Sequence, residues 1–274
     1  MSAPAVLPIA AFTMYDLPEL RKATDDWWTA IARHLRRAGI EDVPAALTRG
    51  RTVGENWRDP ALLLTQTCGY PLTHAYAGDL TAIAVPDYRA EGCGGGTYSS
   101  AFVVREEDPA KTLADLRGRR AAANGPDSQS GCNVLRAAVA AIADGERFFS
   151  EVLWSGAHRN SLAMVREGKA DIAALDGVTF ALVGDAAPQE IEGIRVLGWS
   201  ATTPALPYAV RRAADADTRQ RVTDALLAAA ADPESAGARD TLRIAGMLPA
   251  EDTDYTVMVA MREAAEARGY PLLA

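Results

Sequence analysis

Residues 115–136 read DLRGRRAAANGPDSQSGCNVLR and contain the local transition that decides the fold. An apolar run at 121–123 leads into the small polar residues GPDSQSGCN at 125–133, and helical periodicity begins at Val134. A strand that passes through a turn rich in glycine and serine into a helix is typical of an α/β sheet. The first amides of such a helix lack intrahelical acceptors, so the turn can cap the helix, bind an anion, or do both.

Strand-like and helix-like segments alternate along the whole chain, as in an α/β protein with a largely parallel sheet. Strands are expected at residues 7–12, 43–47, 61–66, 80–85, 100–106, 119–123, 151–154, 171–175, 195–200 and 207–212. The first helix is expected to follow Asp16 as its N-cap, with Pro18 in the first turn and Glu19 as the reciprocal carboxylate. A helix at 217–230 and a helical tail are expected after the last strand.

The composition excludes several classes of protein. The 274 residues are 49% hydrophobic and 23% charged, which suits one large or two modest cores and argues against disorder. The net charge of −8 is unsuited to nucleic acid, whose phosphates require a basic surface. Cys68, Cys93 and Cys132 show no C-x-x-C spacing, so we expect neither a disulfide framework, nor a metal site, nor a cofactor.

Membrane insertion is not expected, because the apolar stretches are too short to span a bilayer. The segment MSAPAVLPIAAFTMYDLPE at 1–19 lacks the basic flank and the continuous apolar core of a signal peptide. The residues alone therefore predict a chain that is cytoplasmic or already trimmed.

Four motifs in order resemble the phosphate-, phosphite- and phosphonate-binding components of ABC transporters. They are YSSAFVVREED at 98–108, the stretch at 115–136, SGAHRNSLAMVREGKADIAALDG at 155–177 and TTPALPYAVRR at 202–212. The resemblance implies a type II periplasmic-binding-protein fold, in which two α/β lobes are joined by two crossover strands, here near 99–106 and 197–209. It predicts a discontinuous first lobe, 1–99 with 207–274, a second lobe at 100–206, and a ligand cleft between the lobes.

The resemblance also implies a function. A protein of this kind captures a small polar anion, here phosphonate- or phosphate-like, by closing its lobes at a hinge, and hands it to an ABC permease without performing chemistry. It implies a periplasmic location, with the cytoplasm as the alternative, and we expect a monomer.

The resemblance places the anion in the turn before Val134. The family holds its anion with a serine, threonine, serine, glycine run, which Ser128, Ser130 and Gly131 match and in which Gln129 replaces the threonine. Hydroxyls and helix-terminal amides bind phosphoryl oxygens without a basic side chain. Gln129, with Asp127 beside it, departs from a plain phosphonate site, and the alternative for the whole turn is a simple helix cap.

Further candidate ligand residues follow the other strands. His158 corresponds to a histidine that faces the ligand in the family, Arg159 beside it is a possible cationic partner, and Asp176 at a strand end is a possible partner for a ligand amine. The remaining candidates, at strand ends and at the first crossover, are Tyr15, Gln66, Tyr70, Tyr98, Ser99 and Ser100. The tyrosines could wall the body of a ligand, whereas capping, core packing or solvent exposure are the structural alternatives.

Two other functions are compatible with the sequence. Cys132 at a helix start and His158 could form a nucleophile and its base in a small-molecule enzyme, although no third orienting residue is recognisable. A cytosolic ligand sensor on the same fold is the second alternative. No segment before residue 7 could form a helix-turn-helix, so such a sensor would act through a partner.

Overall fold

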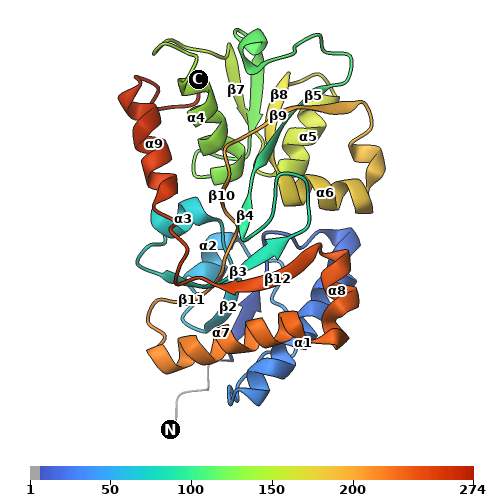
Figure 1. Cartoon of the computed structure of the whole chain (residues 1–274), viewed down its shortest axis with the longest axis vertical. Helices are drawn as coiled ribbons and strands as arrows, with labels where there is room; N and C mark the ends of the chain where they lie inside the picture. Colours follow the sequence, from blue (N-terminus) through green and yellow to red (C-terminus); the bar gives the residue numbers. More distant parts are fainter. Residues whose placement is uncertain (1–6) are drawn as a thin grey trace. The chain divides into compact units, whose positions relative to one another are not determined.

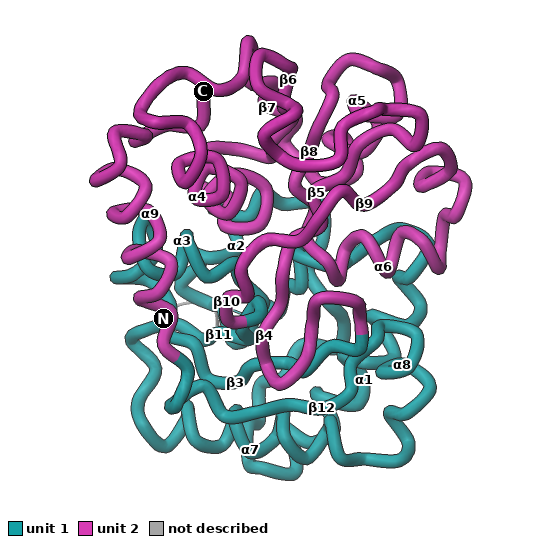
Figure 2. The backbone as a smooth tube through the Cα atoms, turned by 45° about the horizontal axis from the view of Figure 1, so that its top comes forward, with its two compact units in different colours: residues 1–89, 205–253 teal, residues 90–204, 254–274 magenta. Residues whose placement is uncertain are grey.

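The computed structural model describes residues 7–274, and packing divides them into two compact units. Unit 1 contains the chain up to Arg89 and Ala205–Thr253, and unit 2 contains Ala90–Pro204 and Asp254–Ala274 (Figure 2). The predicted lobe limits remain a prediction. In this division, residues 90–99 and the segment from Asp254 onward pack with unit 2.

Unit 1 is built on a mixed five-stranded sheet with the order β1-β2-β11-β3-β12. Its strands are β1 Ile9–Ala11, β2 Leu62–Gln66, β3 Leu80–Tyr88, β11 Tyr208–Arg211 and β12 Ile244–Pro249. β1 and β2 are parallel, and β11 runs antiparallel to both β2 and β3. The carboxyl ends of β1, β2 and β3 therefore meet the amino end of β11 at one edge of the sheet.

Helices complete unit 1 (Figure 1). They are η1 Pro18–Leu20, α1 Arg21–Arg37, α2 Val53–Trp57, α3 Gly69–Thr73, α7 Ala216–Ala231, η5 Pro233–Ser235 and α8 Ala236–Thr241. The spacing of Trp27, Ile31 and Leu35 places them on one face of α1, and all three are buried. Helix α1 packs against α7 and α8.

Unit 2 has a second five-stranded sheet with the order β7-β6-β8-β5-β9. Its strands are β5 Ser100–Arg105, β6 Arg120–Ala123, β7 Glu151–Trp154, β8 Ile172–Asp176 and β9 Ile194–Trp199, and β4 Thr97–Tyr98 pairs with β10 Thr203–Pro204 in a separate ribbon. β6 is parallel to β7 and β8, and β5 is antiparallel to β8. The carboxyl ends of β6, β7 and β8 thus share an edge with the amino end of β5.

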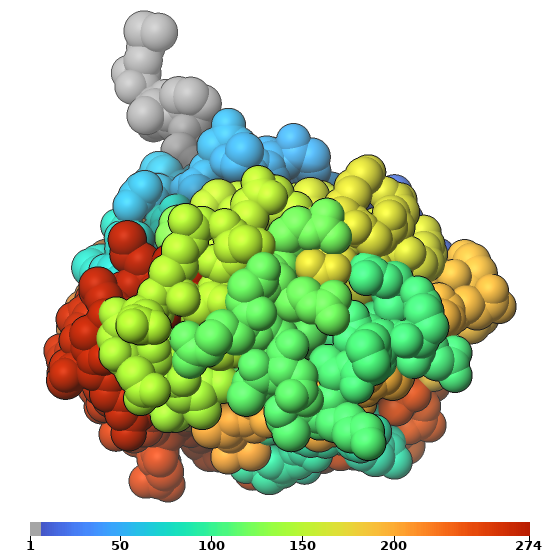
Figure 3. Space-filling model, turned by 90° about the horizontal axis from the view of Figure 1, so that it is seen from above, coloured from blue at the N-terminus to red at the C-terminus, as the bar shows by residue number. Residues whose placement is uncertain are grey.

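The helical elements of unit 2 are η2 Leu113–Leu116, η3 Gln129–Asn133, α4 Val134–Ala140, α5 His158–Arg166, α6 Gly177–Ala186, η4 Pro188–Glu190 and α9 Val257–Ala267. Alanines on β6 leave room for α4, and Leu135, Val139, Phe148 and Phe149 fill the space between. α9 packs against α4. The amides of Phe148 and Phe149 donate to the Ala274 carbonyl. In Figure 3, red surface from the C-terminal part of the chain adjoins yellow-green surface from its middle.

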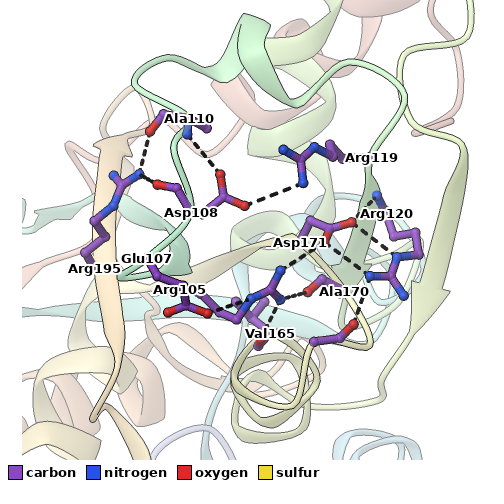
Figure 4. Close-up of polar contacts among 11 residues, drawn as sticks. Arg105, Glu107, Asp108, Ala110, Arg119, Arg120, Val165, Ala170, Asp171 and Arg195 are labelled. Carbon is purple, nitrogen blue, oxygen red and sulfur yellow. Dashed lines mark hydrogen bonds and ion pairs between the residues drawn. The ribbon is translucent and has the colours of Figure 1, made fainter.

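Arginines and carboxylates tie the opposite edge of the unit 2 sheet (Figure 4). Asp171 is 5% exposed and accepts hydrogen bonds from the Arg120 amide at 2.9 Å and from Arg105 Nη2 at 3.2 Å. Arg195 donates to the carbonyls of Asp108 and Ala110. These contacts lie at the end of β5 and the starts of β6 and β8, on the edge of the sheet opposite Ser100 and Ala123. They therefore stabilise the fold of unit 2 away from the candidate site.

Three expectations about the elements were wrong. Asp16 does not cap a helix, because its carboxylate binds Arg49 Nε at 2.5 Å, and α1 begins only after the 3₁₀ turn η1. Residues 43–47 form no strand, and the chain instead joins the sheet through the Thr48 amide, which donates to the Ala10 carbonyl at 2.7 Å. The tail is not wholly helical, because β12 pairs with β3.

Among residues 7–274, no helix is both long enough and apolar enough to cross a membrane. In the same part of the chain, no three His, Cys, Asp or Glu side chains gather in a metal-binding group.

Candidate functional site

The turn after β6 presents free amides at the carboxyl edge of the unit 2 sheet. η3 is a π-helical turn in which the Asn133 amide donates to the Ser128 carbonyl at 2.9 Å, and Ser128 Oγ accepts from the Gly131 amide at 3.0 Å. The first amides of a helix have no intrahelical acceptor, and those of Gln129 and Ser130 find none elsewhere in residues 7–274. The turn therefore caps the helix through Ser128 and also presents two amides that are free to donate hydrogen bonds.

Gly131 lies in close contact with two neighbouring side chains of this turn. A Cβ atom there would lie 2.6 Å from Asn124 Oδ1 and 3.1 Å from Ser128 Oγ. Asn124 was missed by the sequence analysis, although it directly follows β6. Its Oδ1 is buried and has no hydrogen-bond donor among the described residues.

His158 supports the turn from the first residue of α5. Its Nε2 lies 2.8 Å from Ser130 Oγ. Burial lowers the pKa of His158 to about 4, and a backbone contact with Ala174 opposes this only in part. The imidazole is therefore neutral near pH 7, and it acts as a hydrogen-bonding group and not as a cation.

Gln129 turns its side chain into the interior. It is fully buried, its Oε1 accepts from Asn133 Nδ2 at 2.7 Å, and its Nε2 lies 3.5 Å from Met261 Sδ on α9. Only its backbone amide is presented at the turn. The neighbouring Asp127 is exposed, so solvent screens its carboxylate.

Asp176 and Ser100 are paired across β8 and β5 at the same edge. Asp176 Oδ1 accepts a hydrogen bond from the Thr179 amide at 2.8 Å, so the carboxylate caps the start of α6. Capping was the alternative to ligand binding in the sequence analysis. The Ser100 amide donates to Ser200 Oγ at 2.9 Å, whereas Ser100 Oγ is buried and has no partner among the described residues.

Tyr98 and Ser99 complete the unit 2 candidates. Tyr98 is 1% exposed on β4, where it pairs with Thr203, and Ser99 accepts from the Gly177 amide through its carbonyl at 3.0 Å. Arg159, the possible cation beside His158, is bound to Glu190 through its Nε at 3.0 Å. Its charge is thus already paired within unit 2.

In unit 1, Tyr15 and Gln66 line a cavity of about 20 Å³ at the carboxyl ends of the strands. Gln66 Nε2 donates to Tyr88 Oη at 2.9 Å and to the Leu206 carbonyl, and the Tyr15 and Tyr88 rings meet edge to face. The other lining residues are Phe12, Thr24, Trp27, Tyr88, Tyr208, Leu242 and Ile244. Sequence reasoning missed Tyr208, which lies at the start of the predicted strand 207–212, and Tyr88, which is the last residue of β3 and lies beyond the predicted strand 80–85.

Tyr70 lies elsewhere in unit 1. Its ring stacks on His74 at 3.8 Å between centroids, and it does not line the cavity. This stacking agrees with the packing alternative for Tyr70.

Cys132 has the properties of a core residue. It is 3% exposed, and burial is the main cause that raises the pKa of its thiol to about 11. A neutral thiol is a poor nucleophile, and the hydrogen-bond partner of His158 is Ser130.

Comparisons with known proteins identify a family and several solved structures of similar fold. The family described as "ABC transporter, phosphonate, periplasmic substrate-binding protein" matches residues 52–255. PhnD1 from Prochlorococcus marinus, solved with methylphosphonate, is 14% identical with a TM-score of 0.76, covering 96% of this chain and 99% of its own. XAC2383 from Xanthomonas citri, solved with ATP, is 19% identical with a TM-score of 0.68, covering 96% and 98%. A search of curated proteins found no match.

Proposed function

The chain belongs to the periplasmic substrate-binding proteins of phosphonate ABC transporters, and we propose that its turn at 128–131 binds the anionic group of the solute. Membership confirms the resemblance drawn from the four motifs, the two-lobe α/β fold class and the solute-binding role in ABC import. A transport family also gives the chain a small-molecule ligand and a permease as partners.

The observation that carries the proposal is the arrangement of donors around Ser130. The free amides of Gln129 and Ser130 and the hydroxyls of Ser128 and Ser130 stand at one helix start. The charged oxygens of a phosphoryl group are hydrogen-bond acceptors. Amides at a helix start offer them hydrogen-bond donors together with the favourable helix dipole.

His158 prepares Ser130 for this role. The neutral imidazole lies with its Nε2 2.8 Å from Ser130 Oγ and so holds this hydroxyl at the helix start. Protonation is not required. The depressed pKa of His158 therefore matches a binding role that is constant across neutral pH.

Methylphosphonate is the first ligand to test, because PhnD1 was solved in complex with it. Binding roles for Tyr15, Gln66 and Asp176, and lobe closure around the ligand, remain predictions, as do roles for Tyr70, Tyr98, Ser99 and Ser100.

The location and the partners follow the family in outline. The family is periplasmic, and we propose that this chain acts there as a monomer beside its permease. A sensor remains the alternative, and capture of a signalling partner only in the presence of ligand would favour it.

Calorimetry and thermal unfolding with methylphosphonate, phosphite, phosphate, aminoethylphosphonate, sulfate and ATP test the proposal. We expect a phosphonate or a close analogue to raise the melting temperature, since a ligand of the folded state stabilises it. Ser130→Ala should weaken binding by about 1–3 kcal/mol, because it removes a donor to a charged group. Ser150→Ala is the control, because the Ser150 hydroxyl donates to the Arg119 carbonyl at an exposed site.

Two outcomes would overturn the proposal. One is the absence of binding by every anion in the panel, and the other is unchanged affinity in Ser130→Ala. ³¹P NMR of the bound phosphonate over hours separates binding from catalysis, since turnover would produce a new resonance and favour the enzyme alternative.

A further inference from the structure

Arg136 is a buried arginine on α4 that has only neutral partners. It is 6% exposed, its Nη1 donates to the Pro271 carbonyl at 3.0 Å, and its Nη2 donates to Asn133 Oδ1. Its Nε is buried without a partner, and no carboxylate within residues 7–274 forms an ion pair with it.

A guanidinium in this position is energetically unusual. Arginine stays charged in proteins, and buried charges are normally paired because desolvation of an ion is costly. Neutral carbonyl and amide oxygens solvate the Arg136 cation only in part. Unit 2 therefore holds a positive charge that its described residues do not neutralise.

The charge of Arg136 is directed toward the turn. A long side chain on a helix leans toward the helix N-terminus, and Arg136 contacts Asn133 one turn earlier. Asn133 in turn donates to Gln129 Oε1 at 2.7 Å and to the Met258 carbonyl at 3.2 Å. The six residues from Ser130 to Arg136 correspond to a rise of about 9 Å, which the leaning side chain shortens.

Other charges near the turn do not supply this positive potential. The charge of Arg136 lowers the pKa of the neighbouring Cys132 thiol, an effect smaller than that of burial, so its field extends to the residue next to Gly131. Arg159 is paired with Glu190, and the only charged side chain between residues 124 and 135 is that of Asp127, which is negative.

We propose that Arg136 is the counter-charge for the anion bound at residues 128–131, a positioning residue that stabilises the ligand without touching it. This inference rests on the proposed function of that turn. The bound anion supplies the negative charge that the buried guanidinium lacks, and the hydrogen bonds from Arg136 to Asn133 and from Asn133 to Gln129 connect the guanidinium with the helix start.

Two substitutions at Arg136 separate charge from hydrogen bonding. Arg136→Met removes the charge and keeps much of the length, whereas Arg136→Lys keeps the charge but loses the fork that joins Asn133 to Pro271. For methylphosphonate measured by calorimetry, we expect Arg136→Met to weaken binding about tenfold and Arg136→Lys to stay within about threefold. Equal losses in the two variants would indicate a purely structural role and overturn the proposal.

Arg195→Met is the matched control. Arg195 is a partly buried arginine of unit 2 that also donates to two carbonyls, those of Asp108 and Ala110. Its loss should leave the affinity unchanged. Hydrogen exchange of the 128–134 amides without ligand should be alike in Arg136→Met and Arg136→Lys, which would show that both variants keep the turn equally ordered. A difference in affinity between them then reflects the charge of residue 136.

A second variant keeps the proposal testable if Arg136→Met does not fold. Gln129→Glu places a carboxylate where Asn133 already donates, and so neutralises Arg136 without removing it. Weaker methylphosphonate binding is expected, and unchanged affinity would overturn the counter-charge. Failure of the wild type to bind any anion would instead refute the proposed function, while a loss in Ser130→Ala with none in Arg136→Met would refute this inference alone.

Discussion

Ser130 Oγ and His158 Nε2 lie 2.8 Å apart, which joins the start of one helix of unit 2 to the start of the next. Ser130 follows β6 and His158 follows β7, and these strands are parallel neighbours. Two residues separated by 28 positions thus meet because their strands end at the same edge. The contact couples the hydroxyl that we assign to the anion with a buried imidazole.

This burial predicts a pH dependence of stability. The pKa of His158 is about 4 in the folded state and about 6.5 in an unfolded chain. Between these pH values the unfolded state binds more protons than the folded state. The stability that follows from the lowered pKa of His158 is therefore fully present above pH 6.5 and is lost as the pH falls toward 4. Between pH 7 and pH 5, the wild type should lose up to about 2 kcal/mol more unfolding free energy than His158→Gln.

Chemical denaturation at several pH values checks this difference. His34→Gln is a useful control, because His34 instead bonds to the Asp232 carboxylate at 2.8 Å in unit 1. Parallel stability curves for the wild type and His158→Gln would show that the imidazole titrates normally and is not buried as described.

Gly131→Ala should damage binding through a steric conflict. The new Cβ would lie 2.6 Å from Asn124 Oδ1, closer than van der Waals contact permits, so the Asn124 side chain or the turn must shift. We expect at least a tenfold loss of anion affinity and a stability loss of about 1–3 kcal/mol. Gly198→Ala on β9 is the matched control, because no atom lies within 4 Å of its added Cβ. Wild-type affinity in Gly131→Ala would contradict the geometry of the turn.

The turn could be predicted from sequence because its determinants are local. A strand, a glycine and serine cluster and helical periodicity follow one another within 121–140, and the structure has β6, η3 and α4 in that order. The π-helical turn was not foreseeable. A π-helical turn contains one residue more than an α-helical turn, and in this turn the Gln129 side chain points into the interior. There it contacts Met261, which is 132 positions away in the sequence.

The same limit explains the errors in unit 1. Asp16 has the sequence context of an N-cap, yet Arg49 binds its carboxylate from 33 positions away. Tyr88 lies beyond the predicted strand 80–85, and its contact with Gln66 arises because β2 and β3 both pair with β11. Local patterns thus predict elements and turns, whereas distant partners decide where a polar side chain points.

The inward orientation of Gln129 predicts opposite effects for two neighbouring residues. Gln129→Leu removes the acceptor of Asn133 Nδ2 and places no new group at the surface of the turn, so it should cost about 1–3 kcal/mol of stability and change anion affinity by less than about threefold. Ser130→Ala should show the reverse, a large loss of affinity with a small loss of stability. Urea unfolding measures the stability of each variant, and calorimetry measures its affinity for the anion. A loss of affinity in Gln129→Leu as large as that in Ser130→Ala would mean that the Gln129 side chain reaches the ligand.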